Sequence, residues 1–255
     1  MPPPRCSTLP DGGGPPALIE TVAETASTNS ALLERLRRAE AVPEGHWLVA
    51  DRQVAGRGRA GRTWSDGAGN FMGSTVALLR TGDPLAPTLA LVAGLAVHGA
   101  IAEVAGALPG LMLKWPNDLL VDTAKLAGVL LERQADAVVV GIGVNLASAP
   151  DVPNRKTTSL STLGTTVVRD DFAAALAAHW QALLARWHRG EWPALRQEWL
   201  ARAHPTGTLL SVKDAAQGAV MGAFAGLDAD GAALLRLADG QVRAIHAGDL
   251  DLVGE

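Results

Sequence analysis

The sequence predicts an α+β fold in which a β-sheet is backed by helices and a small β-barrel follows. Two long segments, 87–105 and 170–199, are rich in Ala and Leu and predict buried helices. Between them, the apolar runs 111–115, 126–131 and 137–144 are separated by turn residues, as neighbouring strands of one sheet are. Together they favour a layered domain.

The first third of the chain adds one helix and two strands to this domain. Ser27-Thr28-Asn29 precedes SALLERLRRAE, whose leucines share one helical face, and a hydroxyl or amide at this position is a favourable N-cap. The runs 46–50 and 71–79 predict strands, and the polar, Gly-rich segment between them has no period.

The chain divides into three parts. Residues 1–16 are rich in Pro and Gly and predict a loose, flexible tail, and a main domain is expected over 17–206. Over 207–255, short apolar runs are separated by Asp230-Gly231 and Asp239-Gly240, two hairpin signals that predict a small antiparallel barrel.

Composition narrows the class of protein. Apolar residues make up 48% of the chain and charged residues 19%, which excludes a disordered protein. The net charge of −4 offers no overall positive field for non-specific nucleic-acid binding. A single cysteine, Cys6, excludes a disulfide framework and fits the cytoplasm. The apolar stretch 85–108 contains Pro87, His98 and Glu103, so we expect a buried helix there and no membrane contact.

The most informative segment is QVAGRGRAGRTW, residues 53–64. It matches the dinucleotide fingerprint G-x-G-x-x-G from Gly56 to Gly61 and nearly matches a P-loop ending at Arg62-Thr63. Both sites need a helix directly after the glycines to bind phosphates. The following TWSDGAGN is a poor helix former, and Arg62 replaces the P-loop lysine. Neither a Rossmann site nor a P-loop ATPase is favoured.

The same segment has a chemistry of its own. Arg57, Arg59 and Arg62 alternate with glycines, which allow the backbone to approach a ligand closely. Guanidinium groups bind carboxylate and phosphate oxygens in bidentate fashion. The pattern indicates a loop that closes over an anionic ligand, and the alternative is a solvated surface loop.

A second group of polar residues follows the run 111–115. Lys114 and Lys125 lie at the edges of apolar strands, where a low dielectric strengthens anion binding. Asn117 and Asp118 follow a proline turn and offer oxygen ligands for Mg²⁺. An ordinary strand–turn–strand would account for the same residues.

Small residues end the run 137–144. Gly141-Ile142-Gly143-Val144-Asn145 would admit a flat ligand, and Asn145 could read an adenine edge. Other chemistries have little support, because the six histidines lack metal-ligand spacing and the chain contains no G-x-S-x-G nucleophile motif.

In combination and in this order, the motifs resemble those of the biotin protein ligase family. They are S-T-N at 27–29, Q-x-x-G-R-G-R-x-G-R-x-W at 53–64, K-W-P-N-D-L at 114–119, K-L-A-G-V-L-x-E at 125–132 and G-I-G-V-N at 141–145. The resemblance implies a mixed β-sheet backed by helices, in a class II synthetase-like catalytic domain, and a C-terminal SH3-like barrel.

The resemblance also implies an activity. Such a ligase activates biotin with ATP and Mg²⁺ to biotinyl-5′-AMP and transfers the biotinyl group to one lysine of a biotin carboxyl carrier protein or domain of an acetyl- or acyl-CoA carboxylase. Biotin and ATP are then substrates, and no tightly bound prosthetic group is expected.

Site residues carried over from the resemblance fall into four sets. Lys125 and Arg57 are expected to be catalytic. The expected biotin-binding residues are Ser27, Thr28, Asn29, Gln53, Gly56, Arg57, Gly58, Arg59, Lys125 and Gly128. The expected nucleotide-binding residues are Arg59, Arg62, Trp64, Lys114, Asn117 and Asn145. Asp118 is the expected contact for Mg²⁺.

Two alternatives share parts of this pattern. A lipoate- or octanoate-type protein ligase would have the same fold, and a non-catalytic protein could bind biotin alone. Only about 20 residues precede the catalytic core, too few for a helix-turn-helix domain. We therefore expect the monofunctional type, which does not bind DNA, as a cytoplasmic monomer or weak homodimer.

Overall fold

The fold is taken from a computed structural model, which describes residues 5–8, 18–65, 67–153, 155–214, 218–246, 248 and 250–252. Within them, eight strands form the main sheet, in the order β1-β2-β3-β4-β8-β7-β6-β5. In that order the strands are Arg5–Thr8, Leu18–Thr25, Trp47–Gln53, Phe71–Leu78, Ala137–Val144, Ala124–Gln134, Asp118–Val121 and Leu111–Lys114. β2 and β3 run parallel and their neighbours antiparallel, which confirms a mixed sheet.

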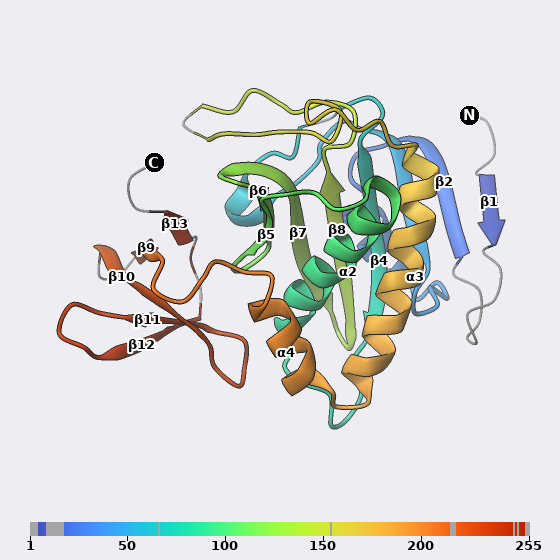
Figure 1. Cartoon of the computed structure of the whole chain (residues 1–255). Coiled ribbons are helices and arrows are strands. Elements are labelled where there is room, and N and C mark those ends of the chain that lie inside the picture. Colours follow the sequence, from blue (N-terminus) through green and yellow to red (C-terminus); the bar gives the residue numbers. More distant parts are fainter. Residues whose placement is uncertain are drawn as a thin grey trace.

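Helices cover both faces of this sheet. They are α1 (Thr28–Arg37), α2 (Thr88–Ala105), α3 (Arg169–His188) and α4 (Trp192–Leu200). α2 and α3 pack side by side on one face (Figure 1). α1 packs on the other face, where Leu32 and Leu33 meet Val76 and Val139. The predicted layered domain is confirmed.

Strand alternation explains why the two faces differ. Val138, Val140 and Ile142 of β8 point into the large core beneath α2 and α3, while Gly141 and Gly143 lie on the opposite face.

α2 is long and apolar enough to cross a membrane by length and composition, but 61% of it is buried inside the protein. It is the predicted core helix.

A second sheet follows the main domain. Its strands, in the order β12-β11-β10-β9-β13, are antiparallel and span Val242–Ile245, Ala233–Arg236, Gly218–Leu227, Leu209–Asp214 and Leu250–Leu252. Two indoles of the main domain hold one of its turns, because Trp115 Nε1 donates to Gly231 O at 2.9 Å and Trp192 Nε1 donates to Ala229 O at 2.6 Å. This sheet is consistent with a small SH3-like domain.

Several predicted boundaries are wrong. Residues 5–8, predicted within a loose tail, form the edge strand β1. The helix predicted over 170–199 breaks at Gly190, whose φ of +76° ends α3. β2 and β6 were not predicted, and β6 begins at Asp118, at the end of a predicted turn.

Candidate functional site

A cavity of about 290 Å³ opens on the α1 side of the main sheet. Eight segments of the chain line it: the start of α1, the end of β3, the arginine loop (residues 56–64), Gly73 of β4, Asn117 before β6, the glycine-bearing stretches of β7 and β8, and the loop after β8. Most predicted site residues lie on its lining, namely Ser27, Thr28, Asn29, Gln53, Arg57, Gly58, Arg59, Arg62, Trp64, Asn117, Lys125, Gly128 and Asn145.

One wall of the cavity is polar and lies at the first turn of α1. Ser27 is the N-cap of this helix, as predicted. Gln53 Oε1 accepts from the backbone N–H of Thr28 at 2.7 Å and lies 3.1 Å from its hydroxyl. Thr28 Oγ1 lies 2.6 Å from Ser74 Oγ, which donates to Asn29 Oδ1 at 2.6 Å. We call Ser27, Thr28, Asn29 and Gln53 the polar wall; all four are buried.

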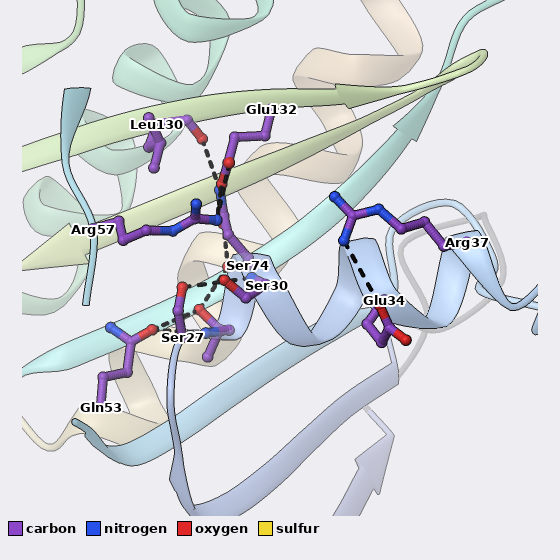
Figure 2. Close-up of polar contacts among 11 residues, drawn as sticks. Ser27, Ser30, Glu34, Arg37, Gln53, Arg57, Ser74, Leu130 and Glu132 are labelled. Atoms are coloured by element: carbon purple, nitrogen blue, oxygen red, sulfur yellow. Dashed lines mark hydrogen bonds and ion pairs between the residues drawn. The ribbon is translucent and has the colours of Figure 1, made fainter. Parts of the chain in front are cut away.

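Arg57 lies on the cavity lining, and its guanidinium group points toward Glu132 (Figure 2). Its Nη2 atom donates to both carboxylate oxygens of Glu132, at 2.9 and 3.0 Å. Asn29 Nδ2 donates to the same carboxylate at 2.9 Å. In this structure, Arg57 is thus paired with a carboxylate, and its predicted direct role at the reacting groups stays a prediction.

Glycines form the floor of the cavity because large groups press against them. A Cβ on Gly143 would overlap the indole of Trp64, and a Cβ on Gly141 would overlap the amide of Asn29. Gly128, which pairs with Gly143 across β7 and β8, lies against the same indole. The flat group on these glycines is therefore a protein side chain here, where the sequence predicted a ligand.

Lys125 is the buried cation of the cavity. Its Nζ donates to Asp118 Oδ1 and lies 5.7 Å from the Trp64 ring centroid. Burial lowers the pKa of Lys125 below its usual value, and the Asp118 carboxylate opposes that shift. Arg62 and Arg155 add positive charge and lower the pKa of Lys125 further. The lining thus concentrates positive charge in a low-dielectric site, which suits an anionic ligand.

The carboxylate of Asp118 is ion-paired with basic side chains of the protein itself. Besides Lys125, its second oxygen lies 4.0 Å from Arg155 Nη1. The described residues hold no cluster of three or more His, Cys, Asp or Glu side chains able to bind a metal ion. This arrangement does not fit a resident Mg²⁺ on Asp118, because its carboxylate already balances two positive charges.

The arginine loop is a short hairpin that contacts the segment between β12 and β13. Gly58 N–H donates to Arg62 O at 2.7 Å, and Trp64 N–H donates to Gly56 O at 3.0 Å. Arg59 donates to Asn117 Oδ1 at 3.1 Å and to Gly248 O at 3.2 Å. The loop therefore links both parts of the chain at the mouth of the cavity.

Three predicted residues need separate mention. Lys114 is not on the lining, and its Nζ lies 3.6 Å from Asp251 Oδ1 of the second sheet. Gly56 lies beside the cavity, where its carbonyl closes the loop hairpin. Asn145 is on the lining, but its Nδ2 donates to Thr158 O at 3.0 Å, so the adenine contact stays a prediction.

Three residues of the site were not predicted from the sequence: Ser74, Glu132 and Arg155. Glu132 ends the quoted K-L-A-G-V-L-x-E motif, which was a usable signal. Ser74 is an ordinary strand residue, and its place beside Thr28 depends on the pairing of β3 with β4. Arg155 lies in a loop without any motif.

Comparisons with known proteins agree on one family. Residues 22–146 match the biotin/lipoate A/B protein ligase family, and residues 211–253 match the biotin protein ligase C-terminal domain. The chain is 39% identical over 229 residues to a biotin–[acetyl-CoA-carboxylase] ligase of Paracoccus denitrificans, covering 84% of this chain and 92% of that protein. A ligase of the same name from Mycobacterium tuberculosis is 33% identical, covering 91% and 88%. The biotin protein ligase of Aquifex aeolicus in complex with biotin and ATP superposes with a TM-score of 0.79 and 28% identity, covering 92% of this chain and 97% of that one.

Proposed function

The chain belongs to the biotin/lipoate A/B protein ligase family, and from this premise we propose that it joins biotin to a carrier protein. It activates biotin with ATP to biotinyl-5′-AMP and transfers the biotinyl group to a lysine of acetyl-CoA carboxylase. The observation that carries this proposal is the cavity itself, in which a polar wall faces a buried, ion-paired lysine.

The first step needs positive charge at the cavity. A carboxylate oxygen of biotin attacks the α-phosphorus of ATP, the new O–P bond forms, and the bond to pyrophosphate breaks. Both reactants are anionic, so cations must offset their repulsion. We assign this task to Lys125, which lines the cavity together with Arg62 and Arg155.

The second step transfers the acyl group. The neutral amine of an acceptor lysine attacks the acyl carbon of the mixed anhydride, AMP leaves, and the amine loses its proton. Until then, the anhydride must be kept from water. The arginine loop is suited to this task, because Arg59 ties it to Asn117 and to the second sheet at the cavity mouth.

Mg²⁺ enters this proposal only as a partner of the nucleotide. Magnesium commonly binds the phosphates of ATP and keeps several water ligands. Because Asp118 pairs with Lys125 and Arg155, we propose MgATP as the substrate and derive no step from a metal bound to the protein.

The remaining expectations are part of the same proposal. We propose a cytoplasmic enzyme, where ATP is available, that acts as a monomer or weak homodimer and has no affinity for DNA. Sedimentation at several protein concentrations measures the oligomeric state. Electrophoretic mobility of labelled duplex DNA measures the affinity for DNA.

Biotin-dependent exchange of pyrophosphate into ATP tests the activity. Purified protein should show exchange with biotin and little with lipoate or octanoate, followed by labelling of a carrier domain. Preference for lipoate would establish the related ligase instead. Biotin binding without exchange would establish a binding protein.

A further inference from the structure

A continuous chain of polar contacts joins the polar wall to the arginine loop. It runs from Gln53 Oε1 through the backbone N–H and the hydroxyl of Thr28 to Ser74, then through Asn29 to Glu132, and ends on Arg57 (Figure 2). Ser74 is fully buried, whereas the Glu132 side chain is 24% exposed and the Arg57 side chain 46% exposed. Glu132 thus lies where the buried part of this chain of contacts meets the arginine loop.

Glu132 determines how the amide of Asn29 is oriented. Asn29 Nδ2 donates to Glu132 Oε2 at 2.9 Å and lies 3.4 Å from Leu130 O. The reversed amide would place Oδ1 against a carboxylate and a carbonyl, both of which only accept hydrogen bonds. The carboxylate charge therefore holds Oδ1 on the side of Ser74 and the cavity floor at Gly141.

This orientation sets the hydrogen-bonding character of the polar wall. Since Asn29 Oδ1 carries no proton, Ser74 must donate to it and can only accept from Thr28. The wall then presents two carbonyl oxygens, Gln53 Oε1 and Asn29 Oδ1, beside the hydroxyl groups of Ser27 and Thr28. A cyclic urea carries one N–H donor on each side of a carbonyl acceptor. Its N–H groups complement the two carbonyl oxygens of the wall, and its carbonyl complements the hydroxyl groups.

We infer that Glu132 is a positioning residue for recognition of the biotin ring: its carboxylate orients the Asn29 amide and, through Arg57, holds the arginine loop beside the polar wall. This inference rests on the proposed function and adds to it. Glu132 does not itself line the cavity, so it acts through its two neighbours.

Substitution of Glu132 separates this role from a general structural one. In Glu132→Gln, the side chain keeps its size but can pair with either orientation of Asn29, and it loses the charge that holds Arg57. We expect the dissociation constant for biotin, measured by calorimetry, to rise about tenfold while the KM for ATP stays within about twofold. Glu132→Asp retains the charge and should recover part of the biotin affinity.

Loop release provides a second readout. Trypsin should cut the arginine loop of ligand-free Glu132→Gln faster than that of the wild type, because the Arg57 contact is lost. The matched control is Glu34→Gln, which removes a carboxylate paired with Arg37 and Arg38 on the far part of α1 (Figure 2). It should change neither biotin affinity nor cleavage.

Two results would overturn the inference. One is unchanged biotin affinity in Glu132→Gln, and the other is an equal loss of affinity for biotin and ATP together with a lowered Tm, which indicates a structural role only. If the wild type bound biotin without pyrophosphate exchange, the proposed activity would fail, but the biotin dissociation constants would still decide the role of Glu132.

Discussion

Lys125 donates a hydrogen bond to Asp118, the residue seven positions earlier, across the paired strands β6 and β7. The register of these strands shifts between Leu119 and Leu120, next to this contact. Lys125 Nζ also lies 5.7 Å from the centroid of the Trp64 ring, so the lysine contacts both a carboxylate and an aromatic ring. A lysine held in this way is ready to contact an anion without first being ordered.

Removal of Lys125 should abolish activation of biotin. In Lys125→Ala, we expect adenylate formation to fall by about two orders of magnitude or more, because the main buried cation of the cavity is lost. Pyrophosphate exchange measures the rate, and circular dichroism checks the fold. The control is Lys156→Ala, since Lys156 is an exposed lysine in the loop after β8. Near-normal exchange by folded Lys125→Ala would refute the role.

Arg155 should contribute to nucleotide binding although no motif marks it. It lines the cavity and shares Asp118 with Lys125. We expect Arg155→Ala to raise the KM for ATP about threefold to tenfold and to leave the biotin dissociation constant unchanged. Arg133→Ala, on an exposed side chain, serves as the comparison. A change in biotin affinity alone would contradict this assignment.

Arg59→Gly should release the activated intermediate. The substitution removes the contacts with Asn117 and with Gly248, which lies between β12 and β13, so the loop no longer closes over the cavity. The expected result is several-fold more biotinylation of a bystander protein such as albumin, detected by streptavidin blotting. Arg80→Gly alters an exposed loop elsewhere and should not leak. Equal bystander labelling by wild type and Arg59→Gly would count against a closing loop.

Stability should decline as the pH falls below about 6.5. Burial lowers the pKa of His46, His98 and His204 below the ordinary value of 6.5, so the folded protein favours their neutral forms. The unfolded chain binds protons first, and the stabilising contribution is full above pH 6.5 and decreases as the pH falls toward the folded pKa values. Urea unfolding at pH 7.5 and 5.5 should differ by about 1 kcal/mol or more. His46→Gln should reduce this dependence, whereas the exposed His246→Gln should not; identical dependence in all three proteins would show that buried histidines are not its cause.

Local sequence patterns predicted most elements but not their partners. The strand at 137–144 was predicted to the residue, because it is continuously apolar and buried on both faces. β7 extends to Gln134, beyond the predicted run, because its last three residues are polar and an apolar run does not include them. The roles of Ser74 and Glu132 depend on register between strands far apart in the sequence, which periodicity cannot supply. Lys114 shares a motif with site residues, yet its Nζ lies near Asp251 of the second sheet, a contact between segments far apart in the sequence.

Ser27, Thr28 and Asn29 occupy consecutive positions at the first turn of α1, so they cannot move independently. A substitution that slides or tilts this helix would displace three members of the polar wall at once. Enlarging the cavity for a bulkier ring is therefore better attempted from the opposite side, where side chains of β7 can be shortened one at a time. The helix that builds the wall also makes it the least adaptable side of the site.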